Sequence, residues 1–493
     1  MLANINTAHC GAPKIRCHAF VPFGQVRGRE GPTVCTAKTV AYFPVAFQSF
    51  QGHLRQAARK VWPAEGQRLD ILTAMDMQRT GPSEATMVPT NEVSVHLPPL
   101  GQIPTTMRAA VIRSARFGEP VDAFRIEYVP VPQIAGDQVL VAVIAAGVNY
   151  NGIWACAGAP VDVIALRRRA GALEDYHIAG SDGAGIVWAV GPDVRDLRIG
   201  DAVVISCGQW EVATQGERPP DGDTLMSPTI WGYESNHGSF AEYTVVHEYQ
   251  CHPKPERLTW PEAACFLLTG ATAYRQLFGW PPHTVRAGDP VLIWGGAGGV
   301  GSAAIQLVRN AGGIPIAVVS SQERADYCRS LGASVINRSE FHHLGPLPSL
   351  GDNAAFEGWN AEVRRFGRSL WNAIGERRSP RIVLEHSGMS TLPTSLYVCD
   401  SGGMVVTCGA TSGHFAHVDL RYLWMRQKRL QGSHFADLGE CRSFVHLVAT
   451  GAIQPCLSQT FEFEEVGQAH QLMHENRQLP GSMAVLVNAT RSS

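Results

Sequence analysis

The most informative segment for the fold is Val291-Leu-Ile-Trp-Gly-Gly-Ala-Gly-Gly-Val-Gly-Ser302. Its apolar start predicts a buried strand, and a glycine-rich turn follows directly. The next residues, 303–313 (AAIQLVRNAGG), have a helical pattern, and residues 314–319 (IPIAVV) form a second apolar run. A strand, a glycine-rich turn, a helix and a parallel strand make the βαβ unit in which a dinucleotide pyrophosphate binds the amides at a helix amino terminus.

The glycines of this turn have a steric purpose. Only glycine allows the tight turn, the close backbone approach to phosphates and the close packing of helix on sheet. A glycine-rich turn alone is weak evidence, because such turns also occur for purely structural reasons. Here the flanking strand and helix are both present, so we expect a dinucleotide site. Its residues are Gly296, Ala297, Gly298, Gly299, Val300 and Gly301.

The end of the second strand indicates which nicotinamide cofactor is used. An acidic side chain at this point would bind the ribose 2′-hydroxyl of NAD. The chain instead has Ser320, Ser321 and Arg324, whose hydroxyls and guanidinium suit a 2′-phosphate. The predicted cofactor is therefore NADPH. The serines could also cap the next helix, with Glu323 in its first turn, and the two roles can coexist.

The sequence outside this βαβ unit has a different pattern. Short β-prone runs closed by Gly, Pro or Asp precede it, among them 108–115, 124–132 and 137–154. The sequence predicts an α/β fold in which a Rossmann dinucleotide-binding domain (264–435) is inserted in a β-rich catalytic domain (106–263 and 436–493). Residues 1–105 keep no helical or alternating period, and we expect a weakly ordered extension there.

Composition excludes several classes of protein. The 493 residues carry 41 Lys and Arg against 43 Asp and Glu, a net charge of −2, which argues against nucleic acid or an anionic membrane as partner. No apolar run approaches the ~18 residues of a membrane span, and the first residues lack a signal-peptide core. The 12 cysteines include no CxxC pair, so reduced thiols are expected. These features predict a cytoplasmic enzyme.

The sequence predicts no catalytic metal. A catalytic zinc needs about three His, Cys or carboxylate ligands from defined positions. The nearest candidates, His177, Cys207 and His237, share no familiar ligand spacing.

Six separated strings make the chain resemble the crotonyl-CoA carboxylase/reductases and their longer-chain relatives, within the zinc-independent medium-chain dehydrogenase/reductase superfamily. They are residues 149–154 (NYNGIW), 230–236 (IWGYESN), 238–242 (GSFAE), 421–429 (RYLWMRQKR), 431–436 (QGSHFA) and 472–476 (LMHEN). The resemblance covers about residues 107–493 and implies a GroES-like fold for the β-rich domain. Zinc-dependent members have Gly-His-Glu where this chain has Gly180-Ser181-Asp182.

The resemblance implies an activity. The family reduces a 2-enoyl-CoA with NADPH and captures CO2, which gives an alkylmalonyl-CoA. The catalytic residues that it implies are Asn151, Tyr233, Glu234 and His434, and the CoA-binding residues are Arg421 and Tyr422. Fixed donors in a dry pocket suit CO2, and Asn and His side chains supply such donors. Whether Asn149 or Asn151 faces the substrate stays open, with Asn151 preferred.

Three alternatives follow from the same residues. Each implied site residue could have a structural role instead, such as satisfying a turn backbone. The enzyme could be a non-carboxylating enoyl-thioester or quinone reductase, or the chain could be a non-catalytic NADPH-binding protein. The expected partners are 2-enoyl-CoA and CO2 as substrates, with no nucleic acid and no membrane, and the resemblance implies a homodimer or homotetramer. The closing strand begins Gly481-Ser482, where many relatives have Gly-Lys.

Overall fold

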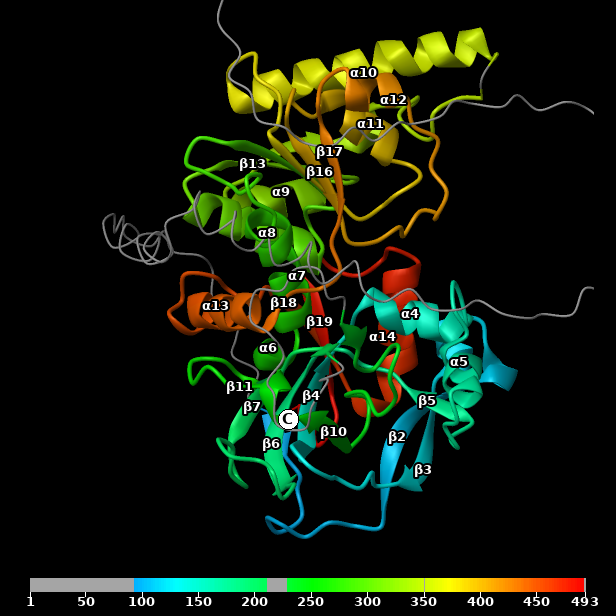
Figure 1. Ribbon diagram of the computed structural model, residues 1–493, viewed down its shortest axis with the longest axis vertical. Coiled ribbons are helices and arrows are strands. Elements are labelled where there is room, and N and C mark those ends of the chain that lie inside the picture. The colour runs from blue at the N-terminus through cyan, green and yellow to red at the C-terminus, as the bar shows by residue number, and fades with distance from the viewer. Residues whose placement is uncertain (1–92, 211–227, 350, 492–493) are drawn as a thin grey trace, which may run out of the picture. The chain divides into compact units, whose positions relative to one another are not determined.

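A six-stranded parallel sheet forms around the glycine-rich segment. The computed structural model of the chain describes residues 93–210, 228–349 and 351–491. The sheet order is β14-β13-β12-β15-β16-β17 (Figure 1). Its strands are β12 (Pro290–Trp294), β13 (Ile314–Val319), β14 (Ser334–Asn337), β15 (Ile382–Glu385), β16 (Met404–Thr407) and β17 (Arg429–Gly432). The central strands are almost fully buried, as expected for a parallel sheet covered on both faces. The predicted Rossmann fold is confirmed.

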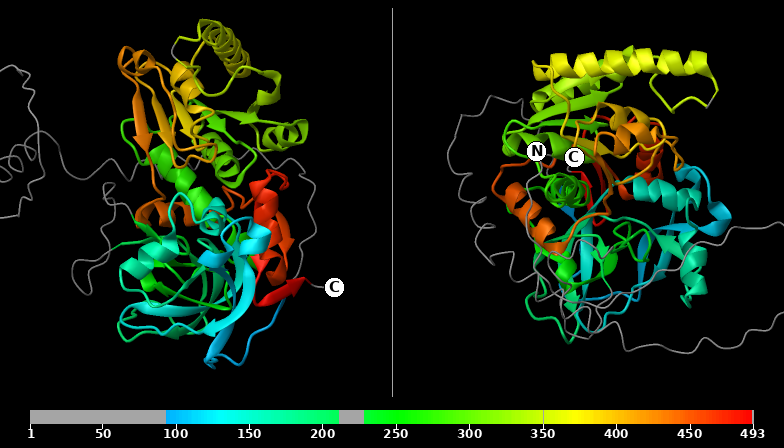
Figure 2. Two further views of the ribbon diagram at one scale, coloured as in Figure 1. Left: turned by 90° about the vertical axis from the view of Figure 1, so that its right-hand side faces the viewer. Right: turned by 45° about the horizontal axis from the view of Figure 1, so that its top comes forward.

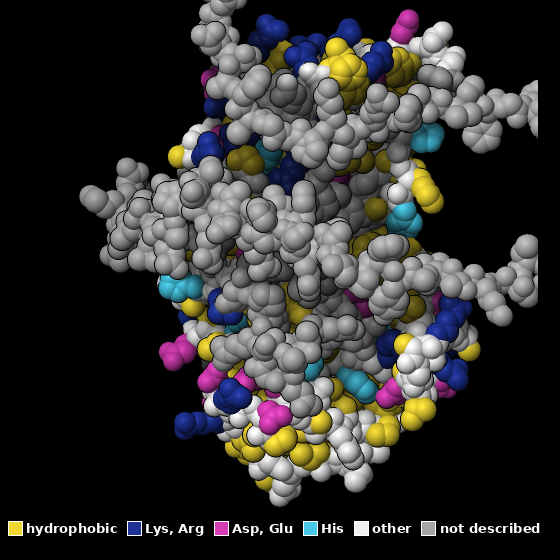
Figure 3. Space-filling view, viewed as in Figure 1, with side chains coloured by type: hydrophobic (Ala, Val, Ile, Leu, Met, Phe, Trp, Pro, Cys, Tyr) yellow, Lys and Arg dark blue, Asp and Glu magenta, His cyan; other side chains and the backbone are white. Residues whose placement is uncertain are grey.

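Helices surround and extend this sheet. They are α7 (Leu267–Phe278), α8 (Gly299–Asn310), α9 (Gln322–Ser330), α10 (Asn353–Ile374), α11 (Leu392–Val398), α12 (Leu420–Trp424) and α13 (Leu438–Ala449). Helix α10 buries Trp359, Val363, Phe366 and Leu370, which recur at helical spacing on one face. Figure 3 shows Lys and Arg side chains along the edge where Figure 1 draws α10. The basic residues of this helix therefore belong to a solvated face.

A seven-stranded sheet forms the core of the β-rich part. Its order is β11-β7-β6-β4-β19-β18, and β10 also pairs with β4. The strands are β4 (Gln138–Gly147), β6 (Gly183–Val190), β7 (Ala202–Ile205), β10 (Tyr243–His247), β11 (Cys251–Pro253), β18 (Leu457–Phe461) and β19 (Ser482–Leu486). The last two strands come after the Rossmann sheet in sequence, yet β19 lies directly beside β4 (Figures 1 and 2). The Rossmann unit is thus inserted in the β-rich fold, as predicted.

Smaller elements complete this part. They are β2 (Thr106–Arg113), β3 (Arg125–Pro130), β5 (Tyr176–Ile178), β8 (Gly208–Gln209), β9 (Thr229–Ile230), α3 (Pro120–Ala123), α5 (Val163–Arg169), α6 (Trp260–Ala264) and α14 (Val466–His474). In the described ranges, no helix is long and apolar enough to cross a membrane.

One β-prone run was interpreted wrongly. The sequence predicts a β-prone run over residues 137–154, but only β4 is a strand there, and residues 150–157 form helix α4 (Tyr150–Ala157). The contact that fixes this helix is tertiary. Gly152 packs so closely on His470 of α14 that a Cβ at this position would overlap the imidazole ring.

The expected N-terminal extension is only partly described. Residues 1–92 lie outside the described residues. Residues 93–105 differ from the expectation of weak order, because β1 (Val93–Val95) pairs antiparallel with β20 (Ala489–Arg491) and Trp188 Nε1 donates to Gln102 O at 2.9 Å. The boundaries 106–263, 264–435 and 436–493 stay predictions.

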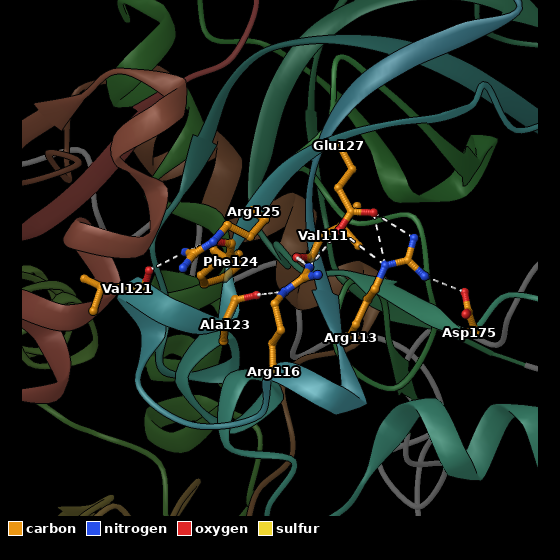
Figure 4. Close-up of polar contacts among 9 residues, drawn as sticks. All are labelled: Val111, Arg113, Arg116, Val121, Ala123, Phe124, Arg125, Glu127 and Asp175. Atoms are coloured by element: carbon orange, nitrogen blue, oxygen red, sulfur yellow. Dashed lines mark hydrogen bonds and ion pairs between the residues drawn. The ribbon is translucent and has the colours of Figure 1, made fainter.

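An ion-pair network joins β2, β3 and the loop before β5 (Figure 4). Glu127 accepts from Arg113 Nη2 at 2.7 Å and from Arg116 Nη2 at 2.8 Å, and Arg113 Nη1 pairs with Asp175 at 2.8 Å. The Arg113 hydrogen bond is the main cause that lowers the pKa of Glu127 below its ordinary 4.5. The stability gained from this pairing is present above that pH and is lost as the pH falls. These arginines are already paired within the fold, so we assign them no ligand.

The packing of α7 against α13 can be tested by a substitution. A Cβ on Gly270 would overlap the ring of Phe444. Alanine favours a helix over glycine by about 1 kcal/mol, but overpacking a core costs about 1–3 kcal/mol. We therefore expect Gly270→Ala to lower the free energy of unfolding, measured by denaturant titration. In a Phe444→Leu background the same change should be neutral or stabilising, and an equal loss in both backgrounds would contradict this explanation.

Candidate active site

The glycine-rich turn leaves the amino terminus of α8 open. Gly295 has φ +60°, and a Cβ on Gly296 would lie 2.6 Å from Ala317 Cβ on the neighbouring strand. A Cβ on Gly301 would lie 2.6 Å from Gly296 Cα. Residues 298–300 are only half-buried. The start of α8 therefore carries no bulky side chain of its own in the glycine-rich turn, as the close approach of a pyrophosphate requires.

The residues predicted to bind the 2′-phosphate also have structural roles. Ser321 caps α9, where its Oγ accepts from Arg324 N at 3.3 Å, while Ser320 is exposed. The Arg324 guanidinium donates to Asn476 Oδ1 at 2.6 Å and to Asn476 O at 2.8 Å. The cap that we considered as an alternative is therefore present. Arg324 is held in place at the carboxyl edge of the parallel sheet.

The segment before β19 lies against the glycine-rich turn. Gly481 N donates to Ala297 O at 2.8 Å, and Gly298 and Gly481 form a parallel bridge. Ser482 lies beside Gly299, so that a Cβ on that glycine would be 3.0 Å from the serine Oγ. The β-rich part thus contributes one wall next to the dinucleotide turn.

The two candidate asparagines have different surroundings. Asn149 is the residue before α4, it is 9% exposed, and its Nδ2 donates to Gly147 O at 3.5 Å. Asn151 is half-buried in the first turn of α4, and its Nδ2 donates to Ser181 Oγ at 3.3 Å. Asn149 therefore faces the protein interior, and Asn151 is the more accessible of the two.

Aromatic side chains connect α4 with the loop that contains Tyr233. The rings of Tyr150 and Trp154 are 5.4 Å apart, and those of Trp154 and Tyr233 are 6.1 Å apart. Burial is the main cause that raises the pKa of Tyr233 to about 12. The phenol stays protonated near neutral pH, so it can donate a hydrogen bond without adding charge.

Glu234 and His434 lie within electrostatic range of each other. Glu234 Oε2 accepts from Ile230 N at 2.7 Å, which fixes the carboxylate on its own turn. Partial burial lowers the pKa of His434 below its ordinary 6.5, the Glu234 charge opposes this shift, and Arg275 adds to it. His434 is therefore neutral above pH 6.5, with one ring N–H as donor. It follows β17, whose carboxyl end lies at the sheet edge where β12 also ends.

The predicted CoA-binding pair lies elsewhere on the Rossmann part. Arg421 is exposed and pairs with Asp419 through two bonds, Nη2 to Oδ2 at 2.6 Å and Nε to Oδ1 at 2.9 Å. Tyr422 packs against Tyr397, with ring centroids 4.9 Å apart. Neither contact involves the other four predicted substrate residues. Those four are related through the ring contact of Trp154 on α4, the helix of Asn151, with Tyr233 and through the electrostatic interaction of Glu234 with His434.

Sequence reasoning missed several residues at this site. Ser181 and Asp182 were noted only for lacking zinc ligands, Trp154 only as part of a string, and Asn476 likewise. A usable signal was the placement of Ser181 and Asp182 directly before the glycine-rich strand β6. Among the described residues, no group of three or more His, Cys, Asp or Glu is placed to hold a metal ion.

Comparisons with known proteins identify relatives of this chain. The model of the alcohol dehydrogenase GroES-like domain matches residues 135–256, and the model named zinc-binding dehydrogenase matches residues 299–450. The structure of the crotonyl-CoA carboxylase/reductase AntE in complex with NADP is 58% identical with a TM-score of 0.75, covering 80% of this chain and 98% of that one. The 2-octenoyl-CoA carboxylase reductase CinF, solved with NADP and 2-octenoyl-CoA, is 35% identical with a TM-score of 0.71, covering 80% and 90%.

Curated relatives extend the likeness. The crotonyl-CoA reductase of Streptomyces collinus is 39% identical over 76% of this chain and 86% of its own length. The crotonyl-CoA carboxylase/reductase of Cereibacter sphaeroides is 47% identical over 80% of this chain and 91% of its own length. On this similarity, the chain belongs to the crotonyl-CoA carboxylase/reductase family.

Proposed function

We propose that the chain is an NADPH-dependent reductive carboxylase that converts a 2-enoyl-CoA and CO2 into an alkylmalonyl-CoA. The observation that carries this proposal is the ring contact between Trp154 of α4, the helix of Asn151, and Tyr233, together with Glu234 in electrostatic range of neutral His434. The relatives solved with NADP, one of them with an enoyl-CoA, support the choice of cofactor and substrate class.

The residues at the glycine-rich turn fit a dinucleotide. The open amides at the start of α8 receive the pyrophosphate, and Arg324 with Ser320 lies where a 2′-phosphate would be bound. NADPH supplies the hydride that reduces C3 of the enoyl group. Gly481 and Ser482, which lie beside the glycine-rich turn, would form one wall of the dinucleotide site.

The reduced thioester has carbanion character at C2. This carbon can form a bond either to CO2 or to a proton. Asn151 donates a hydrogen bond to one oxygen of CO2, and neutral His434 donates to the other. Glu234 orients His434 through its charge, while Tyr233 and Trp154 exclude water from the pocket. Exclusion of water matters because it removes the competing proton source.

The resemblance and the composition support two further proposals. We infer that the enzyme is a homodimer or homotetramer and that it acts in the cytoplasm.

Arg421 and Tyr422 are proposed to bind the adenine nucleotide end of CoA, with the Arg421 guanidinium matched to a phosphate. The exposed position of Arg421 is consistent with a ligand that reaches the surface.

The first prediction concerns the reaction itself. With crotonyl-CoA and a longer 2-enoyl-CoA, we expect NADPH oxidation at 340 nm and, with bicarbonate, a product that is heavier by CO2 in mass spectrometry. A saturated acyl-CoA regardless of bicarbonate would identify a non-carboxylating reductase. Absence of oxidation with every enoyl-CoA would favour a quinone reductase or a binding protein.

The second prediction concerns Asn151. One hydrogen bond to a neutral acceptor is worth about 1 kcal/mol, so Asn151→Ala should lower the ratio of carboxylated to reduced product about fivefold. Hydride transfer does not use this donor, so the rate of NADPH oxidation should change little. An unchanged product ratio would remove Asn151 from the CO2 site.

The third prediction concerns Arg324. A hydrogen bond from a charged group contributes about 1.5–3 kcal/mol, so Arg324→Gln should raise KM for NADPH about tenfold to hundredfold. KM for NADH should change little, because NADH has no 2′-phosphate. An equal increase for both cofactors would mean that Arg324 acts only by holding Asn476.

A further inference from the structure

We propose that Ser181 and Asp182 are positioning residues that hold the two asparagines at the start of α4 and fix them relative to the dinucleotide turn. The inference rests on the proposed reductive carboxylation and concerns the same site. Neither residue touches the substrates in this proposal, and each acts through an asparagine.

The first support is the pairing of side chains. Asn151 Nδ2 donates to Ser181 Oγ at 3.3 Å. Asn149 Nδ2 donates to Gly147 O at 3.5 Å, and Gly147 N donates to Asp182 O at 2.9 Å. The Asn149 amide also favours the charged form of the Asp182 carboxyl group. Two adjacent residues at the entry to β6 therefore meet two asparagines that are two positions apart. This pairing assigns Asn149 to the interior and leaves Asn151 with one long hydrogen bond, which a substrate can replace.

The second support is the burial of Asp182. The residue is 0% exposed, and its Oδ2 accepts from Leu268 N at 3.2 Å. The N–H groups of Leu267 and Gly183 also favour its charged form, whereas burial, the larger effect, raises its pKa well above the usual value. Within the described residues, Oδ1 has no hydrogen-bond partner of regular geometry. A fully buried carboxyl group in such surroundings is costly and calls for a purpose.

The third support is the helix that Asp182 contacts. Leu267 and Leu268 begin α7, whose own preceding residue, Phe266, provides no side-chain cap. The Asp182 carboxylate supplies an acceptor to this amino terminus from a different segment of the chain. One carboxyl group therefore joins the loop before α4 to the start of α7.

The fourth support is the continuation of α7 to the cofactor turn. Thr269, one residue after Leu268, lies beside Gly299, where a Cβ would be 2.9 Å from Thr269 Cγ2. A series of contacts thus runs from Asn149 to Gly147, from Gly147 to Asp182, and through α7 to Gly299. It fixes the distance between the CO2 donors and the dinucleotide, on which the competition between CO2 and a proton depends.

The test compares three variants of the full chain. Asp182→Asn keeps the shape but replaces one acceptor oxygen by a donor that faces N–H groups. Ser181→Ala removes only the hydroxyl that accepts from Asn151, and it serves if Asp182→Asn fails to fold. The matched control is Asn488→Ala, which loses a buried hydrogen bond to Val143 O at 2.9 Å and a partly buried one to Glu242 O at 2.8 Å. Neither bond involves Asn151, Tyr233, Glu234 or His434.

The readout is the ratio of carboxylated to reduced product from a 2-enoyl-CoA, NADPH and bicarbonate. Small displacements of reacting groups cost up to about a hundredfold in rate, so we expect Asp182→Asn to lower the ratio at least about tenfold. Ser181→Ala should lower it severalfold, whereas Asn488→Ala should keep the wild-type ratio despite its lower stability. A purely structural role of Asp182 would lower the amount of folded enzyme without changing the ratio.

Any other result would overturn a specific part of the inference or of the proposed function. Wild-type ratios in both variants would overturn the inference while the proposed function stands. A change in only one variant would overturn the role of the other residue. A reduced ratio in Asn488→Ala as well would show that any loss of stability alters the ratio, which would also overturn the inference. If wild-type protein forms only the reduced product, the proposed function fails and the inference with it.

Discussion

Close backbone contact at the glycine-rich turn is the constraint on which the structure depends. The turn at Gly295–Gly301 touches its own helix, the neighbouring strand β13 and the segment before β19. Side chains at these positions would separate all three. The same lack of side chains suits the start of α8 to an anion. One steric feature therefore allows the Rossmann and β-rich parts to pack closely here and also favours anion binding.

Hydrogen bonds of polar side chains, with Asp182 fully buried, then connect the rest of the site to this turn. Arg324 is bound by Asn476, Asp182 is bound by the start of α7, and Asn151 is bound by Ser181. Such bonds are directional, and leaving one of these groups without its partner costs more than the bond itself contributes. A site made in this way keeps its geometry, which matters for a reaction in which two electrophiles compete for one carbon atom.

Much of the fold was predictable because its signals are local. The apolar runs at β12 and β13 and the glycines between them define a parallel βαβ unit without reference to the remaining chain. Helix α4 was missed because its sequence contains β-prone residues, and the contact between Gly152 and His470 that favours a helix joins distant segments. The catalytic group was predicted through resemblance. The roles of Asp182 and Asn476 depend on what lies beside them in space, which spacing along the chain does not reveal.

The place of β19 has a consequence for how the chain folds during synthesis. This strand lies between β4 and β18, although the entire Rossmann segment separates it from β4 in sequence. A ribosome releases β4 early. Strand β10 can pair with Gln138–Ala142 of β4 before the Rossmann segment emerges, but the end of β4 that β19 later covers, Ala145–Gly147, stays unpaired during that time. The Rossmann sheet, whose strands are contiguous in sequence, can close first. During that interval the exposed edge of β4 is where a chaperone would be needed to prevent pairing with another chain.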